Sequence, residues 1–367
     1  MNDQILNSKV VIVGTVRDCF KFLEQDILKL SKAFALFKDL HWFIVESDSS
    51  DRTVDCLATL QALVPNFHFK SMGKLAADMP LRTERIAFCR NACLDEVTTN
   101  PLLMGAHYLV VADLDNSQSQ LTQEGVMSSF ERDDWGGVTS NQNGLYYDIW
   151  ALRHPVWNPG DCWQQKFFLE GMNLSKDVAT YSAVFSRMIQ VPQESQWIEV
   201  DSSFGGLGIY KTEFLNHARY EGTSATGPWG GQVCEHVAFS AALRANGAKI
   251  FINPKMVNTS LNEHSFLAII PDEMNLLIEI AQQSGEKATD DNGQLQVMHV
   301  TPEDVIAAYK IFLARQPESM SVVQPRVGMT TDMVLIDFLT STEFLSRKGV
   351  ENLIKIAYKK YASLGQN

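Results

Sequence analysis

Short apolar runs alternate with amphipathic stretches through the first third of the chain. The apolar runs have the length and β-branched content of buried strands and lie at residues 9–16, 41–46 and 108–112. The amphipathic stretches are typical of helices and lie at residues 17–38, 51–63 and 82–97. This alternation of strand and helix predicts an α/β fold, in which helices cover both faces of a mostly parallel sheet.

The pattern changes after about residue 197. The stretch 198–200 leads into the glycine-rich stretch 204–210, and a helix at 233–245 and a strand at 249–253 are expected after it. Earlier in the chain, residues 136–140 are strand-like. Residues 222–231 are rich in Gly, Ser and Thr, which predicts a mobile loop. The polar stretch 284–294 predicts a linker, and helices are expected after it at 301–314, 331–339 and 342–361. We therefore expect a first domain over 1–285 and a small all-helical appendage over 295–367.

Composition narrows the class of protein. The 367 residues are 45% hydrophobic, which is enough for a sizeable core, and the formal net charge of -12 argues against a nucleic-acid partner. Cys89 and Cys93 are four residues apart in a helical stretch, which favours buried thiols over a disulfide or a zinc site. Residues 1–4 lack the basic and apolar parts of a signal peptide, and no apolar run approaches bilayer length. These features predict a cytoplasmic protein.

The acidic triplet Asp113-Leu114-Asp115 ends the third apolar run. Two carboxylates two residues apart, where a strand opens into a loop, can turn towards one Mg²⁺ or Mn²⁺ ion that bridges them to a substrate diphosphate. The alternative is that acidic residues close the strand for solubility. Ligands of parallel sheets bind beyond the carboxyl ends of the strands, so residues 14–17, 46–48 and 113–115 are expected to converge.

Charged residues near the triplet extend this candidate site. Arg82, Arg85 and Arg90 lie on one broad face of the helix before it, and guanidinium groups can hold a diphosphate or the carboxylates around a metal. Glu46 and Asp48 follow the second strand and are candidates for contact with a nucleoside. The alternatives are surface ion pairs for the arginines and helix capping for the acidic stretch.

A second group of candidates comes later in the chain. Aromatic rings interleaved with charged groups suit a sugar, although a packed aromatic hairpin has the same composition. Glu235 opens a helix and is a candidate general base, with Asp148 as a further catalytic candidate. His264 is a candidate third metal ligand beside Asp113 and Asp115. The candidate substrate contacts are Asn141, Tyr147, Trp150, Arg153, Gly206 and His236.

Six stretches, in this order, resemble glycosyltransferases of the GT-A fold, and in particular the group around the cryptococcal capsule mannosyltransferases. They lie at residues 46–51, 85–91, 113–115, 147–153, 205–210, and 234–237 followed by 250–254. The resemblance implies a Rossmann-like GT-A domain, a UDP- or GDP-sugar donor, Mn²⁺ or Mg²⁺ at the acidic triplet, and acceptor contacts near 147–153. The stretch after the second strand departs from the usual acidic strand end, which leaves the base preference open.

The tail resembles small helical modules found beside bacterial polysaccharide glycosyltransferases. The matching stretches are 304–319 and 338–344. This resemblance implies a role in capsule or O-antigen synthesis, with an oligosaccharide or lipid-linked glycan as the acceptor. Basic and apolar residues alternate over 346–367, so the last helix could rest on an anionic membrane, or simply pack as a terminal helix.

The function expected from these features is metal-dependent transfer of a sugar from a nucleotide-sugar. Asp113 and Asp115 would hold the cation, and Glu235 would act as base if the reaction inverts the anomeric carbon. Glu235 or Asp148 would support the donor sugar if configuration is retained. Two rivals remain: a phosphohydrolase with Asp113 as nucleophile, and a carbohydrate-binding or scaffold protein that has lost turnover.

Overall fold

The computed structural model describes residues 3–224, 231–260, 300–313, 315–329, 334, 337 and 338. The chain divides into two compact units, residues 1–260 and 261–367. The predicted domain limits at 285 and 295 lie outside the described residues. So do the predicted helix at 342–361, most of the predicted helix at 331–339, and residues 225–230 of the predicted mobile loop.

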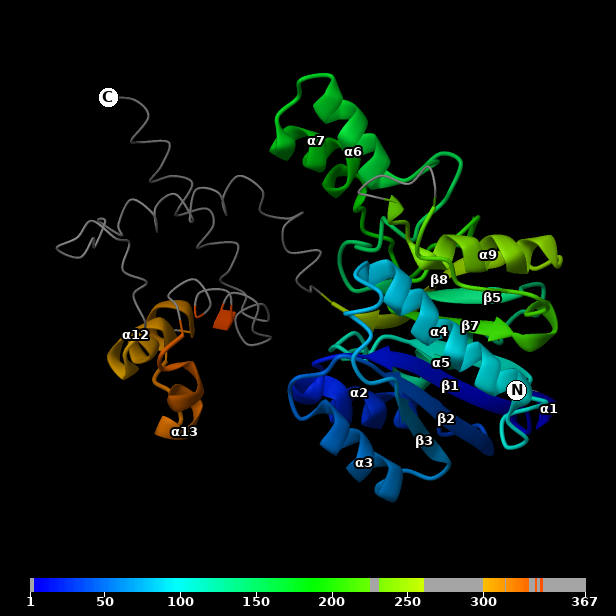
Figure 1. Ribbon diagram of the computed structural model, residues 1–367, viewed down its shortest axis with the longest axis horizontal. Coiled ribbons are helices and arrows are strands. Elements are labelled where there is room, and N and C mark those ends of the chain that lie inside the picture. The colour runs from blue at the N-terminus through cyan, green and yellow to red at the C-terminus, as the bar shows by residue number, and fades with distance from the viewer. Residues whose placement is uncertain are drawn as a thin grey trace. The chain divides into compact units, whose positions relative to one another are not determined.

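The first unit is built on one mixed sheet. Within the described residues it has eight strands in the order β3-β2-β1-β4-β7-β5-β8-β6 (Figure 1). The first four are mutually parallel, β8 is parallel to β5, and β7 and β6 run antiparallel to their neighbours. The α/β fold with a mostly parallel sheet is thereby confirmed. The strands are β1 Lys9–Val16, β2 Asp39–Glu46, β3 Phe67–Ser71, β4 Tyr108–Ala112, β5 Gly137–Gln142, β6 Ile198–Val200, β7 Leu207–Lys211 and β8 Ile250–Thr259.

Helices cover both faces of this sheet. Ile12 packs in one buried cluster with Leu23 and Ile27 of α2, whereas Val13 lines a pocket with Arg90 and Cys93 of α4. Adjacent strand residues point to opposite faces, so α2 and α4 lie on opposite sides of β1. The described α-helices of this unit are α1 Asp3–Leu6, α2 Phe20–Ala33, α3 Thr53–Leu63, α4 Arg82–Thr99, α5 Gln123–Ser128, α6 Cys162–Gly171, α7 Lys176–Ala183 and α9 Glu235–Ala245.

The sequence prediction is close for the strands and weaker for the helices of the middle region. β1 and β4 begin and end at the predicted residues. β3 was not predicted, nor were α6 and α7. Cys89 and Cys93 are buried and free, as expected. No helix in the described ranges has the length and hydropathy needed to cross a bilayer.

The second unit has a small core of its own. Its described helices are α12 Pro302–Leu313 and α13 Met320–Val323, followed by a 3₁₀ turn at Gln324–Arg326. Thr301 accepts a hydrogen bond from the Asp304 N–H at 3.3 Å, which is the N-cap that the sequence predicts. Val305, Tyr309, Val323 and Phe338 belong to its buried cluster.

Gly14 shows how closely the strands pack where β1 meets β4. A Cβ at this position would lie 2.8 Å from the carbonyl oxygen of Ala112 and 3.0 Å from Cδ1 of Leu114. A glycine inside a strand often marks such a close approach of another backbone. Gly14 therefore permits the packing from which the acidic triplet emerges.

Replacing this glycine tests the close approach. Gly14→Ala is expected to lower the free energy of unfolding by about 1–3 kcal/mol, since the added methyl must displace backbone. Gly160→Ala is the matched control, because a Cβ there meets nothing within 4 Å. Urea denaturation of both variants measures the difference. Equal stability of the two variants would contradict the packing described for β1 and β4.

Candidate functional site

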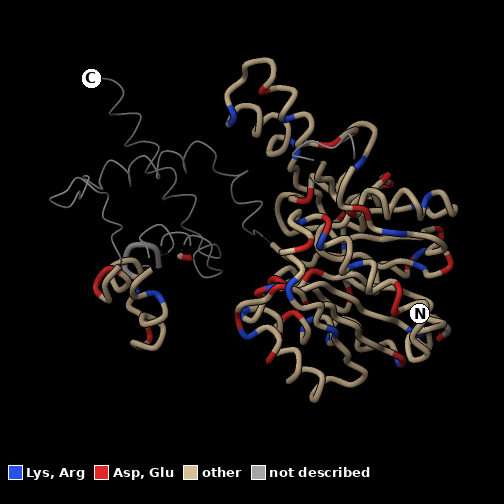
Figure 2. The backbone as a smooth tube through the Cα atoms, viewed as in Figure 1, with Lys and Arg blue, Asp and Glu red and all other residues tan. Residues whose placement is uncertain are grey.

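The predicted convergence of strand ends is confirmed by the register of the sheet. Val16 pairs with Glu46, and Val13 with Val111, so β1, β2 and β4 end at the same edge. β7 is antiparallel to β4 and begins at this edge, because Leu207 pairs with Ala112. Residues 14–17, 46–48, 113–115 and 205–206 thus meet at the carboxyl edge of the parallel strands. Figure 2 shows basic residues interspersed with acidic ones along this edge.

Arg90 of α4 lies at the centre of this edge. Its guanidinium donates from Nη2 to Oδ1 of Asp113 at 2.9 Å and from Nε to Oε1 of Glu235 at 3.1 Å. The side chain is only 6% exposed. Its Cζ lies 5.0 Å from the ring centroid of Phe204 and 5.7 Å from that of Tyr220. Burial alone would lower the pKa of Arg90, but the two carboxylates raise it, so the guanidinium stays charged.

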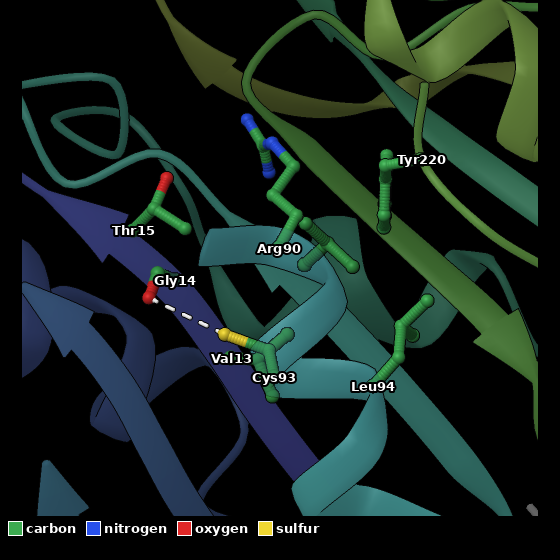
Figure 3. A pocket seen from close by; sticks show the side chains of 8 residues that line it. Val13, Gly14, Thr15, Arg90, Cys93, Leu94 and Tyr220 are labelled. Carbon is green, nitrogen blue, oxygen red and sulfur yellow. Dashed lines mark hydrogen bonds between the residues drawn. The ribbon is translucent and has the colours of Figure 1, made fainter. Parts of the chain in front are cut away.

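A small pocket lies between this arginine and the end of β1. Gly14 and Thr15 line it from the sheet, Cys93 from α4, and Tyr220 from the other side of Arg90 (Figure 3). Nη1 of Arg90 is buried and has no hydrogen-bond partner among the described residues. The guanidinium therefore has unused donor capacity at the site.

The two aspartates of the triplet differ in their surroundings. Oδ1 of Asp113 accepts from Arg90, and Oδ1 of Asp115 accepts from the Ser117 hydroxyl. Burial raises the pKa of Asp113, and its ion pair with Arg90 opposes that change. Within the described residues, the second carboxylate oxygen of neither aspartate receives a hydrogen bond. Each aspartate therefore offers one uncommitted, hard oxygen.

These oxygens suit a divalent cation that is shared with a phosphate ligand. No group of three or more His, Cys, Asp or Glu side chains suited to a metal occurs among the described residues. Mg²⁺ is usually held by one or two carboxylates, with phosphate oxygens and water completing its octahedron. Asp113 and Asp115 fit that donor set. His264, the predicted third ligand, lies outside the described residues.

The predicted nucleoside contacts hold the loops that follow β2 and β3. Oε1 of Glu46 accepts from the Ser49 N–H at 2.9 Å, and its Oε2 accepts from the Ser71 hydroxyl. Oδ1 of Asp48 accepts from the Ala76 N–H at 2.9 Å, and its Oδ2 lies 3.7 Å from Nε of Arg85. Both oxygens of Glu46 are thus engaged in holding these loops, whereas Oδ2 of Asp48 is buried with no hydrogen-bond partner among the described residues. The role of the two residues as nucleoside contacts stays a prediction.

The predicted arginine cluster is spread out. Arg90 is buried against Asp113, whereas Arg85 donates to the carbonyl oxygens of Met79 and Pro80. Arg82 is exposed at the start of α4. Of the three guanidinium groups, Arg90 alone contacts the acidic triplet among the described residues.

The segment 147–153 is anchored through its polar side chains. Oδ2 of Asp148 accepts from the Gly205 N–H at 2.9 Å, and its Oδ1 from the Ala151 N–H at 3.3 Å. Trp150 and Arg153 both donate to Oδ2 of Asp161, at 3.0 and 3.1 Å. Asp161 is the N-cap of α6, so these side chains fix the point at which that helix leaves the sheet.

Gly206 joins this segment to the triplet. Its carbonyl accepts from the Asp113 N–H at 2.9 Å and from Nε2 of Gln118 at 2.8 Å. Its φ is +89°, and a Cβ would lie 3.0 Å from the hydroxyl of Tyr147. Glycine is the residue that combines this conformation with so close an approach. Tyr147 is half-buried beside it.

Two predicted substrate contacts lie in the interior. Asn141 is fully buried and donates to the carbonyl oxygens of Val191 and Pro254. His236 is 3% exposed and stacks on Phe204 at 3.8 Å between ring centroids. Burial lowers the pKa of His236 well below its ordinary value, and Arg90 lowers it further, so the imidazole is neutral. Both side chains are buried in this structure, and their role as substrate contacts stays a prediction.

Asp26 is a residue of this site that sequence reasoning missed. It lies on the buried face of α2 among Leu23, Ile27 and Leu30, and it is 0% exposed. Its Oδ2 accepts from the Asn116 N–H at 2.8 Å. Burial raises its pKa from the ordinary 3.8 to about 7. A carboxylate on the apolar stripe of an amphipathic helix is the signal that could have found it.

No protein-family model and no curated protein matches this sequence. Solved structures similar to the chain include S. aureus TarS 1–349, with 11% identity and a TM-score of 0.41, covering 71% of this chain and 63% of that one. TarS 1–349 in complex with UDP-GlcNAc has 12% identity and a TM-score of 0.41, covering 90% and 71%. The mannosyltransferase PcManGT from Pyrobaculum calidifontis, in complex with GDP-Man and Mn²⁺, has 10% identity and a TM-score of 0.40, covering 76% and 64%.

The chain thus spans less than two thirds of the first of these structures. With TM-scores near 0.4, the function proposed below rests on the site alone. The resemblance to the cryptococcal group stays a prediction.

The buried ion pairs of Arg90 predict a large effect on stability. Arg90→Met is expected to lower the free energy of unfolding by about 3–5 kcal/mol, because Asp113 and Glu235 are left uncompensated. Arg219→Met is the matched control: its partner is Asp95, and both side chains are more than half exposed. That control should cost no more than about 1 kcal/mol. Losses of similar size in the two variants, measured by urea denaturation, would contradict this account of Arg90.

The raised pKa of Asp26 predicts how stability depends on pH. Between pH 3.8 and about 7 the folded chain holds a proton that the unfolded chain has lost, so this group's contribution to stability falls as pH rises. Asp26→Asn removes the ionisable group, so the variant does not lose this stability as pH rises. The variant should match the wild type near pH 4 and exceed it at pH 8 by up to about 4 kcal/mol. Urea denaturation at both pH values tests this, and an Asn variant less stable than wild type at pH 8 would contradict it.

Proposed function

We propose that this chain is a metal-assisted glycosyltransferase that moves a sugar from a UDP- or GDP-sugar to a glycan acceptor. The observation that carries the proposal is the buried pairing of Arg90 with Asp113 at the carboxyl edge of the parallel strands. A charged guanidinium, two uncommitted carboxylate oxygens and the closely packed Gly205–Gly206 turn meet there. This combination suits a diphosphate with its cation.

In this proposal Asp113 and Asp115 hold the cation, and Arg90 holds the diphosphate. Mg²⁺ or Mn²⁺, when bound, would offset the negative charge that develops on the leaving nucleoside diphosphate. Arg90 adds a second positive charge, fixed in position before the reaction, which is the arrangement that stabilises developing charge most effectively. Nη1 of Arg90, which has no hydrogen-bond partner among the described residues, is the donor that we assign to the diphosphate.

Glu235 and Asp148 have structural partners that define their part in the proposal. Glu235 is 7% exposed, and its Oε1 accepts from Arg90, so we assign it to holding Arg90 in place. Both oxygens of Asp148 accept backbone N–H groups, so we assign it to holding the Gly205–Gly206 turn. The roles as base or donor-sugar support that the sequence suggests for these residues remain predictions.

The acceptor side of the proposal rests on Tyr147. Its half-buried ring lies next to Gly206 and could cover the apolar face of a sugar. We propose an oligosaccharide or lipid-linked glycan as acceptor. A role in capsule or O-antigen synthesis, and membrane contact through 346–367, are predictions from residues that lie outside the site, and 346–367 lies outside the described residues.

Nucleotide release from sugar donors tests the proposal. The full chain is incubated with a panel of UDP- and GDP-sugars and Mn²⁺, and the released nucleoside diphosphate is measured. We expect release from at least one donor, loss of release with EDTA, and a drop of about 100-fold or more in Asp115→Asn, which removes a charged group from the site. Asp134→Asn is the control, because Asp134 is exposed and pairs with Arg132 at the surface.

Three outcomes would contradict the proposal. No turnover of any donor would favour the carbohydrate-binding alternative. Release of inorganic phosphate instead of nucleoside diphosphate would favour the phosphohydrolase. Turnover that is indifferent both to EDTA and to Asp115→Asn would place the reaction away from the acidic triplet.

A further inference from the structure

Asp26 is an ionisable residue in a position that packing alone would fill with an apolar side chain. Its neighbours on the inward face of α2 are Leu23, Ile27 and Leu30, all without solvent exposure. Its Oδ1 has no hydrogen-bond partner among the described residues. A buried carboxylate with one unpaired oxygen weakens the fold unless another requirement retains it.

The contact that Asp26 does make leads to the acidic loop, which we define as residues 113–118. Its Oδ2 accepts the Asn116 N–H at 2.8 Å, across 90 positions of sequence. Asn116 has a φ of +78°, a left-handed conformation that Asn tolerates better than most residues with a Cβ. The Asp26 carboxylate holds the N–H of this turn residue, and it does so from the face of the sheet opposite to Arg90.

Other hydrogen bonds tie the acidic loop on either side of Asn116. Ser117 donates to Asp115 within the loop, and Gln118 donates from Nε2 to the carbonyl oxygens of Asp113 and Gly206, at 3.0 and 2.8 Å. The loop is therefore held to Gly206 through Gln118 and to α2 through Asp26. Asp115 directly precedes Asn116, so the contact with Asp26 fixes the backbone next to Asp115.

We propose that Asp26 is a positioning residue for the cation site: it holds the backbone of the acidic loop in the conformation that presents Asp115 beside Asp113. The inference rests on the proposed function, since it concerns the cation that those aspartates bind. Asp26 itself has no contact with the cation. Its role is comparable to that of residues that support metal ligands, whose loss weakens metal affinity without removing a ligand.

Mn²⁺ titration of the full chain, followed by electron paramagnetic resonance at pH 8 with UDP and separately with GDP present, tests this role. Asp26→Ala removes the acceptor, whereas Asp26→Asn keeps one acceptor oxygen without the charge. We expect Asp26→Ala to weaken Mn²⁺ binding about ten-fold or more, and Asp26→Asn to fall between it and the wild type. Glu24→Gln is the control, because it removes a charge from an exposed position of the same helix.

Melting temperatures at pH 8 separate positioning from a structural role. A positioning residue predicts weaker Mn²⁺ binding in Asp26→Asn with a melting temperature equal to or above that of the wild type. A purely structural residue predicts a lower melting temperature and unchanged Mn²⁺ binding, which would overturn the inference. Asp26→Asn carries the test even if Asp26→Ala fails to fold.

The failure of this inference can be told apart from the failure of the proposed function. If the wild type binds Mn²⁺ and Asp115→Asn does not, while both Asp26 variants bind as the wild type does, then the inference alone is overturned. If the wild type binds no Mn²⁺ with either nucleotide, the cation site and the role of Asp26 are both contradicted.

Discussion

A positive charge buried between two carboxylates is the interaction on which the rest of this site depends. Arg90 is carried by α4, Asp113 by the end of β4, and Glu235 by the first turn of α9. Since an isolated buried guanidinium is costly, the three elements must meet in this geometry for the fold to be stable. The ion pairs thereby place a charged donor at the carboxyl edge of the sheet, next to the acidic triplet.

The same edge holds several features that weaken a fold unless function retains them. Asp26 is a carboxylate in an apolar layer, Asp48 and Asn116 have positive φ, and the Gly205–Gly206 turn exists only because neither residue has a side chain. Strain and buried charge tend to gather where a protein binds or transforms a ligand. Their concentration around residues 113–118 agrees with the assignment of the site to this edge.

The sequence predicted the sheet well because its strands carry their own signal. β1 and β4 are unbroken apolar runs, and their parallel arrangement follows from the helices between them. The register then brought the predicted loops together. The periodicity of hydrophobic residues is weak in β3, which has exposed Lys70 and Ser71, and in the short helices α6 and α7. The secondary structure of these segments therefore depends on tertiary packing more than on local sequence.

The residues of the site were harder to predict, because their partners are remote in sequence. Arg90 was expected to act with Arg82 and Arg85, yet its position is set by Glu235, 145 residues away. Asp148, Trp150 and Arg153 have the composition of a sugar site, but hydrogen bonds to Gly205 and Asp161 engage their polar groups. The position of Asp26 on the apolar stripe of α2 could have marked it as unusual, but its partner is a backbone N–H 90 residues away, which no side-chain pattern reveals.

Anomalous diffraction from crystals soaked with Mn²⁺ and either UDP or GDP tests the central claim most directly. The account predicts one Mn²⁺ peak bonded to a carboxylate oxygen of Asp115 or Asp113 and to the diphosphate, with the Arg90 guanidinium in hydrogen-bond contact with the same diphosphate. A nucleotide bound elsewhere, or a bound diphosphate that contacts neither Arg90 nor a cation at the acidic triplet, would contradict it.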